Sequence, residues 1–273
     1  MNQSAAYDLL AIDVDDTLIG PDLAVRPASA AAIRAAVAHG VRVVLATGRM
    51  FRSAKPYAEA LGLAGPIIAY NGAMVRELNG ETWFERPVPL PEALAVQAYA
   101  ARQRLTLNVF IDDALFVEAI NADVDYYMSI AGVTAETVGP LAPFLQAQAA
   151  AGKRPTKLLI VAAAEAVPGH IAGLQADLGG ALEVMRSKPR YIEIIAPGVS
   201  KAAALGAVAE RFGVSQPRIM AIGDSGNDVP MLAYAGLGVA MGHGSETAKQ
   251  AADYVTGSHE DEGLANAIGR FIL

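Results

Sequence analysis

Two short acidic segments, one near each end of the chain, each close a run of apolar residues as long as a buried strand. The first is Asp13-Val14-Asp15-Asp16-Thr17, which ends the run Tyr7–Asp13, and the second is Gly223-Asp224-Ser225-Gly226-Asn227-Asp228, which follows the run Arg218–Ile222. Apolar runs of this length are typical of central strands in open parallel sheets, whose ligand sites lie at the carboxyl ends of the strands. The two segments therefore predict such a sheet, with acids from distant parts of the chain meeting at one edge.

Strand-like and helical segments alternate on either side of these acids. Pro27 opens an alanine-rich helical pattern, the strand Val41–Ala46 follows, and a second helix leads to the strand Pro66–Tyr70. From Gly198 the alternation resumes and continues to the end of the sequence. This order predicts an α/β fold with a Rossmann-like, doubly wound parallel sheet.

The middle of the chain follows a different pattern. Residues 73–85 alternate as a hairpin does, and Pro87, Pro89 and Pro91 make a stiff connection to a series of short strands and helices. We expect an inserted α+β domain here. The predicted domains are a discontinuous core of residues 1–85 and 190–273 and a cap of residues 86–189.

Composition narrows the possible partners and surroundings. The 273 residues carry a formal net charge of −7 and include no cysteine. We expect no nucleic-acid partner, because binding to a phosphate backbone depends on lysine and arginine. Disulfides, thiolate metal ligands and a cysteine nucleophile are excluded. Met1–Leu10 lacks the features of a signal peptide or a membrane span, so we expect a cytoplasmic protein that does not bind membranes. The sequence predicts no oligomeric state.

Four carboxylates are expected to converge at the predicted sheet edge. Asp13 and Asp15 stand two residues apart at a strand end, where both side chains can point the same way, and Asp224 and Asp228 follow a later strand. Converging acids repel one another unless a cation lies among them, and oxygen ligands suit Mg²⁺. One acid of the first pair can attack phosphorus while the other exchanges a proton with the leaving oxygen. Each segment alone also suits a turn or a helix start, but together they predict phosphoryl chemistry.

Other polar residues follow the same strand ends. Thr47 and Gly48 can hold phosphate oxygens, although threonine is also a common helix cap. Asn71-Gly72 fits a turn equally well. Lys201 begins a helix, where the helix dipole disfavours a cation, so a bound anion or nearby acids explain it better than solvent does.

These segments resemble, in order, the four motifs of the haloacid dehalogenase (HAD) superfamily. The matching residues are Asp13-Val14-Asp15-Asp16-Thr17-Leu18, Thr47-Gly48-Arg49, Lys201 and Gly223-Asp224-Ser225-Gly226-Asn227-Asp228. Further stretches are similar to the Cof-type phosphatase branch, subfamily IIB: Tyr70-Asn71-Gly72-Ala73, Gly198-Val199-Ser200-Lys201, residues 235–241 and residues 251–256. The resemblance implies a HAD-like core with a large C2-type cap that closes over the substrate.

The resemblance also implies roles for single residues. Asp13 would be the nucleophile that forms an aspartyl-phosphate, and Asp15 the general acid and base. The implied phosphate- and substrate-binding residues are Thr47, Gly48, Asn71, Gly72, Lys201 and Asn227. The implied Mg²⁺ site consists of Asp13, Asp15 through its backbone carbonyl, Asp224 and the supporting Asp228.

The predicted function is hydrolysis of small phosphorylated metabolites. Sugar phosphates are the expected substrates, with pyridoxal phosphate or a flavin-pathway phosphate as alternatives. A phosphomutase of the same fold would return the phosphoryl group to a sugar hydroxyl, and a non-catalytic sensor would have no need of both Asp13 and Asp15. A carbon–halogen hydrolase has no use for Asp15 or a metal, and a dehydrogenase would need a glycine-rich turn where the first acids stand. The polar cap residues that could select a substrate are Arg102, Arg104, Asn108, Tyr126, Tyr127, Lys188 and Arg190.

One position departs from the pattern of the branch. Asparagine usually follows the Met-Gly pair there, whereas His243 follows Met241-Gly242 in this chain. We expect the histidine to alter contacts at the rim of the site and to leave the four motifs intact.

Overall fold

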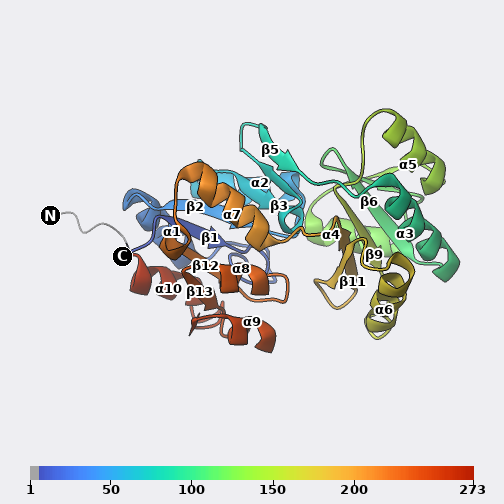
Figure 1. Ribbon diagram of the computed structural model, residues 1–273. Helices are drawn as coiled ribbons and strands as arrows, with labels where there is room; N and C mark the ends of the chain where they lie inside the picture. Colours follow the sequence, from blue (N-terminus) through green and yellow to red (C-terminus); the bar gives the residue numbers. More distant parts are fainter. Residues whose placement is uncertain (1–5) are drawn as a thin grey trace. The chain divides into compact units, whose positions relative to one another are not determined.

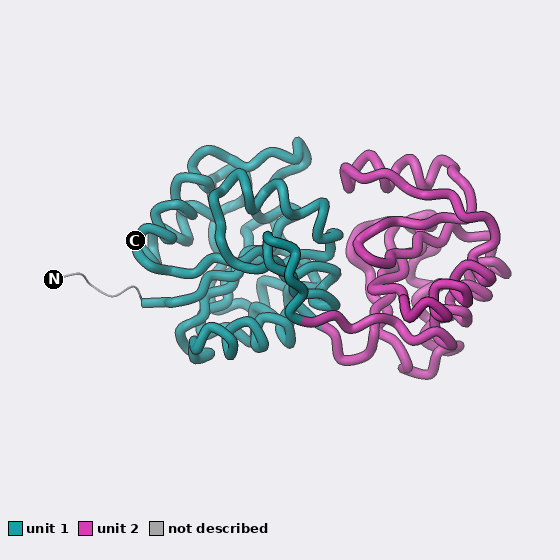
Figure 2. The backbone as a smooth tube through the Cα atoms, turned by 90° about the horizontal axis from the view of Figure 1, so that it is seen from above, with its two compact units in different colours: residues 1–83, 200–273 teal, residues 84–199 magenta. Residues whose placement is uncertain are grey.

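The computed structural model describes residues 6–273, which form two compact units. Unit 1 comprises Met1–Trp83 and Ser200–Leu273, and unit 2 comprises Phe84–Val199 (Figure 2). The expectation for Met1–Leu10 falls partly on residues 1–5, which lie outside the described residues. Among residues 6–273, no helix combines the length and the apolar character needed to span a bilayer.

Unit 1 is built on a largely parallel sheet. Among its described residues eight strands form the order β14-β13-β12-β1-β2-β3-β4-β5 (Figure 1), and those from β14 to β3 run parallel while β4 is antiparallel to β3. All four residues of β1 are fully buried, which explains why this central strand reads as a continuous apolar run. The strands are β1 (Leu9–Ile12), β2 (Arg42–Ala46), β3 (Ile67–Ala69), β4 (Met74–Arg76), β5 (Thr82–Glu85), β12 (Ile219–Gly223), β13 (Leu237–Ala240) and β14 (Tyr254–Val255).

Helices cover both faces of this sheet. Helices α1, α2 and α10 pack together on one face, and α7, α8 and α9 pack together on the other (Figure 1). Their bounds are α1 (Pro27–Ala38), α2 (Phe51–Leu61), α7 (Lys201–Phe212), α8 (Val229–Tyr234), α9 (Glu246–Ala251) and α10 (Gly263–Phe271), with short 3₁₀ turns η1 (Tyr70–Gly72) and η2 (Gln216–Arg218). The arrangement confirms the predicted α/β fold with a doubly wound parallel sheet.

Unit 2 is an α+β structure with its own sheet. Six strands of its described residues form the order β10-β11-β9-β6-β7-β8, antiparallel except for the parallel pair β7 and β8. The strands are β6 (Thr106–Ile111), β7 (Ala114–Val117), β8 (Ala135–Thr137), β9 (Lys157–Val161), β10 (Glu183–Arg186) and β11 (Tyr191–Ile195). The helices are α3 (Leu90–Gln103), α4 (Ala122–Ala131), α5 (Leu141–Ala150) and α6 (Val167–Leu178).

The two faces of the unit 2 sheet differ in polarity. Leu107, Val109 and Ile111 of β6 belong to the apolar core, together with residues of α3, α5 and α6. The alternate positions of β6, Asn108 and Phe110, must point to the opposite face because side chains alternate along a strand. Both are also buried, so neither face of this part of the strand is exposed to solvent.

The boundary between the units differs from the predicted one at its second end. The sequence placed the return to the core at residue 190, whereas unit 2 continues to Val199. The reason is that β11 pairs with β9 on one side and with β10 on the other, so this strand completes the second sheet. At the first end, Trp83 closes unit 1 within β5.

Candidate active site

Four neighbouring parallel strands of unit 1 end next to one another and carry most of the residues singled out in the sequence. Asp13 follows β1, Thr47 follows β2, Asn71 follows β3 and Asp224 follows β12. Backbone hydrogen bonds join the segments, because Asp13 N–H donates to Ile222 and Asn71 N–H donates to Thr47, each at 2.9 Å. The strand order therefore fixes these side chains at one edge of the sheet.

Three carboxylates and one ammonium group form the centre of the site. Carboxylate oxygens of Asp13, Asp224 and Asp228 lie within 4.8 Å of one another. Lys201, the first residue of α7 and fully buried, donates from Nζ to Asp13 Oδ1 at 2.5 Å and to Asp228 Oδ1 at 2.6 Å. A lysine at a helix N-terminus is thus explained by the acids that it contacts, one of the two explanations that the sequence left open.

The second oxygen of Asp228 holds the loop that carries Asp224. Asp228 Oδ2 accepts hydrogen bonds from the backbone N–H groups of Asp224 at 3.1 Å and of Ser225 at 3.0 Å. Thr17, in the first acidic segment, donates from Oγ1 to Asp224 Oδ1 at 3.2 Å. Because both oxygens of Asp228 are engaged by Lys201 and the backbone, this carboxylate is placed to support the site, whereas Asp13 and Asp224 are better placed to bind a cation.

The charges at this centre do not balance. Burial and the charge of Asp228 raise the pKa of Asp13 well above its ordinary value, although the Lys201 ammonium opposes the change. Burial, with the charges of Asp228 and Asp16, raises the pKa of Asp224 to about 7. Burial would lower the pKa of Lys201, but Asp13 and Asp228 reverse the effect and raise it. Lys201 therefore stays charged, and its single ammonium group faces three acidic side chains.

This donor set fits a divalent cation. Oxygen ligands are those that Mg²⁺ prefers, and it commonly binds through one or two carboxylates with water completing its shell. A bound cation would relieve the repulsion that raises the pKa values of Asp13 and Asp224. The acidic cluster is compatible with one such cation.

Asp15 has a partner of its own, Arg49. The Arg49 guanidinium donates from Nε to Asp15 Oδ2 at 2.8 Å and from Nη2 to Asp15 Oδ1 at 2.9 Å, a two-pronged pair. Arg49 is 8% exposed, and its Nη1 also donates to Ser53 Oγ in α2. The sequence predicts that Arg49 belongs to a motif but gives it no role. Its position directly after Thr47-Gly48 is the signal that could have identified it.

The residues that the resemblance assigned to phosphate and substrate binding lie close by. Thr47 is fully buried, and its Oγ1 accepts from Arg49 N–H at 3.0 Å, so its hydroxyl hydrogen remains able to donate. Asn71 adopts the left-handed conformation with φ of 57° and accepts from Asn227 Nδ2 at 2.9 Å. A Cβ at Gly48 would lie 2.9 Å from Asn71 Oδ1, so the segments after β2 and β3 pack tightly.

The backbone conformation and the close packing at position 72 require a glycine. Its φ is +99°, and a Cβ there would collide with the carbonyl oxygen of Ser200, the N-cap residue of α7. Absence of a side chain lets the segment after β3 approach the start of α7, where Lys201 begins the helix. This contact explains why residue 72 is a glycine, and no bound ligand is needed for the explanation.

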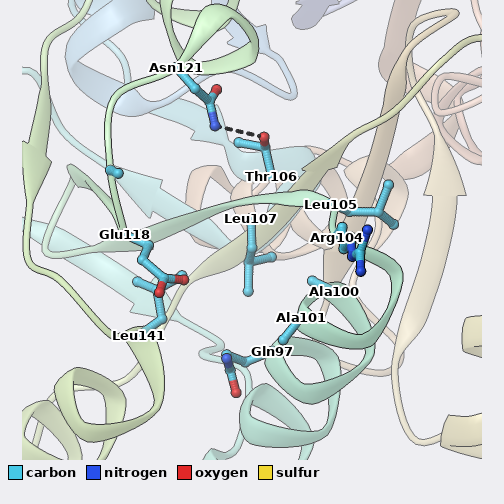
Figure 3. Close-up of a pocket in the computed structure, with 11 residues that line it drawn as sticks. Gln97, Ala100, Ala101, Arg104, Leu105, Thr106, Leu107, Glu118, Asn121 and Leu141 are labelled. Carbon is cyan, nitrogen blue, oxygen red and sulfur yellow. Dashed lines mark hydrogen bonds between the residues drawn. The ribbon is translucent and has the colours of Figure 1, made fainter.

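Unit 2 contains a hollow of about 230 Å³, lined by residues of α3, β6 and the segment after β7 (Figure 3). Its charged lining residues are Arg104 and Glu118, of opposite sign, and Asn121 Nδ2 donates to Thr106 Oγ1 at 3.1 Å. This lining includes no group of converging carboxylates. The converging carboxylates that the sequence predicts lie instead at the strand ends of unit 1.

Two other candidate cap residues, Arg190 and Asn108, differ in whether their polar groups have partners. Arg190 pairs with Asp123 at 2.5 Å, which joins the segment before β11 to α4. Asn108 is fully buried, and neither its Oδ1 nor its Nδ2 has a hydrogen-bond partner among the described residues. Arg190 thus has a structural role within unit 2, whereas nothing in the structure explains the amide of Asn108.

Comparison with known proteins identifies the family of the chain. The family model for haloacid dehalogenase-like hydrolases matches residues 10–268. The chain is 32% identical over 269 residues to the 5-amino-6-(5-phospho-D-ribitylamino)uracil phosphatase YitU of Bacillus subtilis, covering 96% of this chain and 97% of that protein. It is 28% identical to the pyridoxal phosphate phosphatase YbhA of Escherichia coli, with 95% and 97% covered.

A solved structure shows the same fold over nearly the full length. A haloacid dehalogenase-like hydrolase from Bacteroides thetaiotaomicron superposes with a TM-score of 0.85 at 27% identity, covering 97% of this chain and 99% of the other. The family model, the curated relatives and the solved structure all indicate the same family. The chain belongs to the haloacid dehalogenase-like hydrolase family, as a phosphatase of its Cof-type branch that acts on small phosphorylated substrates.

Proposed function

We propose that the chain is a Mg²⁺-dependent phosphatase that hydrolyses phosphate monoesters through an aspartyl-phosphate on Asp13. The observation that supports this proposal best is the environment of Asp13, whose Oδ1 receives a hydrogen bond from the buried Lys201 within a cluster of carboxylates. An amine held at one oxygen leaves the other oxygen of the carboxylate to act as nucleophile.

In the first half of the reaction, an oxygen of Asp13 attacks phosphorus and the bond between phosphorus and the ester oxygen breaks. Asp15 gives a proton to the leaving oxygen, which departs as an alcohol. Lys201 and the hydroxyl of Thr47 donate to phosphoryl oxygens as charge develops on them. Asp15 must leave its bonds with Arg49 at least in part to take up the proton that it transfers, so the pair sets the resting position of the acid.

In the second half, water attacks phosphorus and the bond between phosphorus and Asp13 breaks. Asp15, now a carboxylate, accepts the proton of the water, and the paired arrangement with Arg49 is the one that suits this base. Asp13 returns as a carboxylate and phosphate departs. Atoms and charge balance over the two halves without any further reactant.

The cation would be held by Asp13, Asp224 and the backbone carbonyl of Asp15. When bound, it neutralises negative charge on the phosphoryl group as a Lewis acid. Asp228 supports this set through Lys201 and the backbone of residues 224 and 225. Asn227 and Asn71, joined to each other, border the same segment.

Sugar phosphates are the substrates that we propose first. The B. subtilis relative is named as a phosphatase for a phosphorylated ribitylamino compound, which supports a polyhydroxylated substrate. The E. coli relative is named as a pyridoxal phosphate phosphatase, so pyridoxal phosphate is the alternative substrate. Residues 86–189 are proposed as the cap that selects among them. On that proposal, Arg104→Ala changes the order of preferred substrates and leaves the metal requirement unaltered, whereas an unchanged order would count against a role for Arg104.

The test is release of free phosphate from a panel of sugar, ribityl, pyridoxal and nucleotide phosphates, with Mg²⁺ and with EDTA. Release that requires the metal and disappears in Asp13→Asn supports the proposal. An isomeric phosphate ester with little free phosphate would instead show a phosphomutase. Binding of the same compounds without any turnover would show a sensor.

A further inference from the structure

A third loop, residues 242–245, joins the two acidic segments of the site. Ser245 N–H donates to the carbonyl of Asp224 at 2.7 Å. Gly244 lies so close to Asp224 that a Cβ there would be 2.7 Å from the same carbonyl oxygen. The loop is therefore fixed against the Asp224 segment, and the residue between its two glycines, His243, is the one that extends to the Asp13–Thr17 segment.

His243 uses both of its ring nitrogens. Nε2 lies 2.8 Å from the carbonyl oxygen of Asp16, and Nδ1 lies 3.2 Å from the backbone N–H of His259. A backbone N–H can only donate, so Nδ1 must be the acceptor and carry no proton. The neutral ring then has its proton on Nε2, from which it donates to Asp16. The hydrogen bonds fix this tautomer.

The residue that receives this hydrogen bond has an unfavourable backbone conformation. Asp16 has φ of 62°, in the left-handed region that costs a residue with a side chain free energy unless its surroundings hold it there. The conformation of Asp16 determines how the peptide between Asp15 and Asp16 is turned. That peptide carries the carbonyl of Asp15, and Asp15 is the proposed acid and base.

We propose that His243 is a positioning residue, which holds the Asp15–Asp16 peptide in the orientation that the metal and the acid–base step require. The inference rests on the proposed function. His243 touches no reacting group, and its effect passes through the backbone of Asp16. It links the segment after β1 to the loop after β13, which is itself hydrogen-bonded to the Asp224 segment, and thereby keeps the two sources of metal ligands in register.

Three substitutions separate this role from a general structural one. Gln places an amide nitrogen near the position of Nε2 and can keep the bond to Asp16. Asn, the residue usual in the branch, places its amide near Nδ1 and is too short to reach Asp16 in this loop, and Ala removes both contacts. His243 is exposed, so none of the three creates a buried cavity. His39→Ala, at an exposed histidine that contacts Ala35 of α1 and lies outside the site, is the matched control.

The experiment measures Mg²⁺ affinity by titration calorimetry, kcat on the best panel substrate, and melting temperature for each variant. We expect His243→Ala and His243→Asn to weaken Mg²⁺ binding and to lower kcat, each by about fivefold, the net effect of one hydrogen bond. We expect His243→Gln to remain within about twofold of the unsubstituted protein, as His39→Ala does. Unchanged Mg²⁺ affinity in His243→Ala, or equal losses in the Gln and Ala variants, would overturn the proposal.

Two further readouts keep this inference distinct from the proposed function. Nitrogen NMR of the histidine rings should show that the neutral ring of His243 carries its proton at Nε2, and a neutral ring with its proton at Nδ1 would overturn the assignment whatever the activity. If the unsubstituted protein binds Mg²⁺ but releases no phosphate, the proposed function fails. The calorimetric comparison among the variants then still decides whether His243 positions the metal ligands.

Discussion

Removal of the Arg49 guanidinium should impair catalysis through Asp15. Arg49 makes two charge-assisted hydrogen bonds to Asp15, at 2.8 and 2.9 Å, and its Nη1 is held by Ser53. The pair fixes the proposed acid and base in one place. We therefore expect Arg49→Ala to lower kcat/KM for a phosphate ester while Mg²⁺ binding, which we propose to depend on Asp13 and Asp224, changes little.

The magnitude follows from the exposure and the geometry of the pair. A hydrogen bond to a charged group contributes about 1.5–3 kcal/mol, but the Asp15 side chain is 24% exposed and solvent screens part of this interaction. A loss of about 2 kcal/mol corresponds to roughly a 30-fold decrease in kcat/KM. Arg49→Lys keeps the charge but not the planar pair of donors, so we expect a decrease of about five- to tenfold.

The assay is steady-state phosphate release by four proteins: unsubstituted, Arg49→Ala, Asp15→Asn and the double variant. If Arg49 acts through Asp15, its removal has little further effect once the carboxylate is gone. Ser53→Ala is the matched control, because it removes a contact of Arg49 and leaves the bonds to Asp15 in place; we expect a decrease of at most about threefold. Equal effects of Arg49→Ala in both backgrounds, or no effect in the unsubstituted background, would refute the reasoning.

Two more predictions concern stability. In the metal-free protein the pKa of Asp224 is raised from its ordinary 3.8 to about 7. Between pH 3.8 and about pH 7 the folded state therefore binds more protons than the unfolded state. The free energy of unfolding consequently falls as the pH rises through this range. Mg²⁺ should therefore raise the melting temperature more at about pH 8 than at about pH 5.5, and an equal rise at both would contradict the prediction. Gly72→Ala should lower the free energy of unfolding by more than about 2 kcal/mol, because the added Cβ would collide with the Ser200 carbonyl. The control Gly40→Ala, at a residue with φ of +85° and no atom within 4 Å of the added Cβ, should lower it by only about 1 kcal/mol. Equal urea midpoints for the two variants would argue against the collision.

The sequence predicted the core of unit 1 well because its central strands are buried on both faces. Such strands appear in the sequence as continuous apolar runs, and the fully buried strands β1 and β12 are examples. The strand β8 had no such signal, because its three residues are partly or fully exposed and its pairing with β7 depends on tertiary contacts. The end of unit 2 could not be predicted either, because the apolar sequence of β11 fits a buried strand in either sheet.

The site was predictable to the extent that strand ends determine it. The strand order brings Asp13, Thr47 and Asp224 to one edge, as the positions of their segments indicated. The pairing of Arg49 with Asp15 was not predictable, because the rotamer that directs Arg49 to Asp15 depends on packing between distant segments. Roles of these residues in catalysis remain predictions that the experiments above address.

The most direct test of the central proposal is to trap the phosphorylated protein. The protein is mixed with Mg²⁺ and its best panel substrate, quenched with acid within one turnover, digested and analysed by mass spectrometry. We predict one added phosphoryl group on the peptide that contains Asp13 and its absence in Asp13→Asn. Phosphate release at an undiminished rate from Asp13→Asn, with no phosphorylated peptide in the unsubstituted protein, would contradict the proposal.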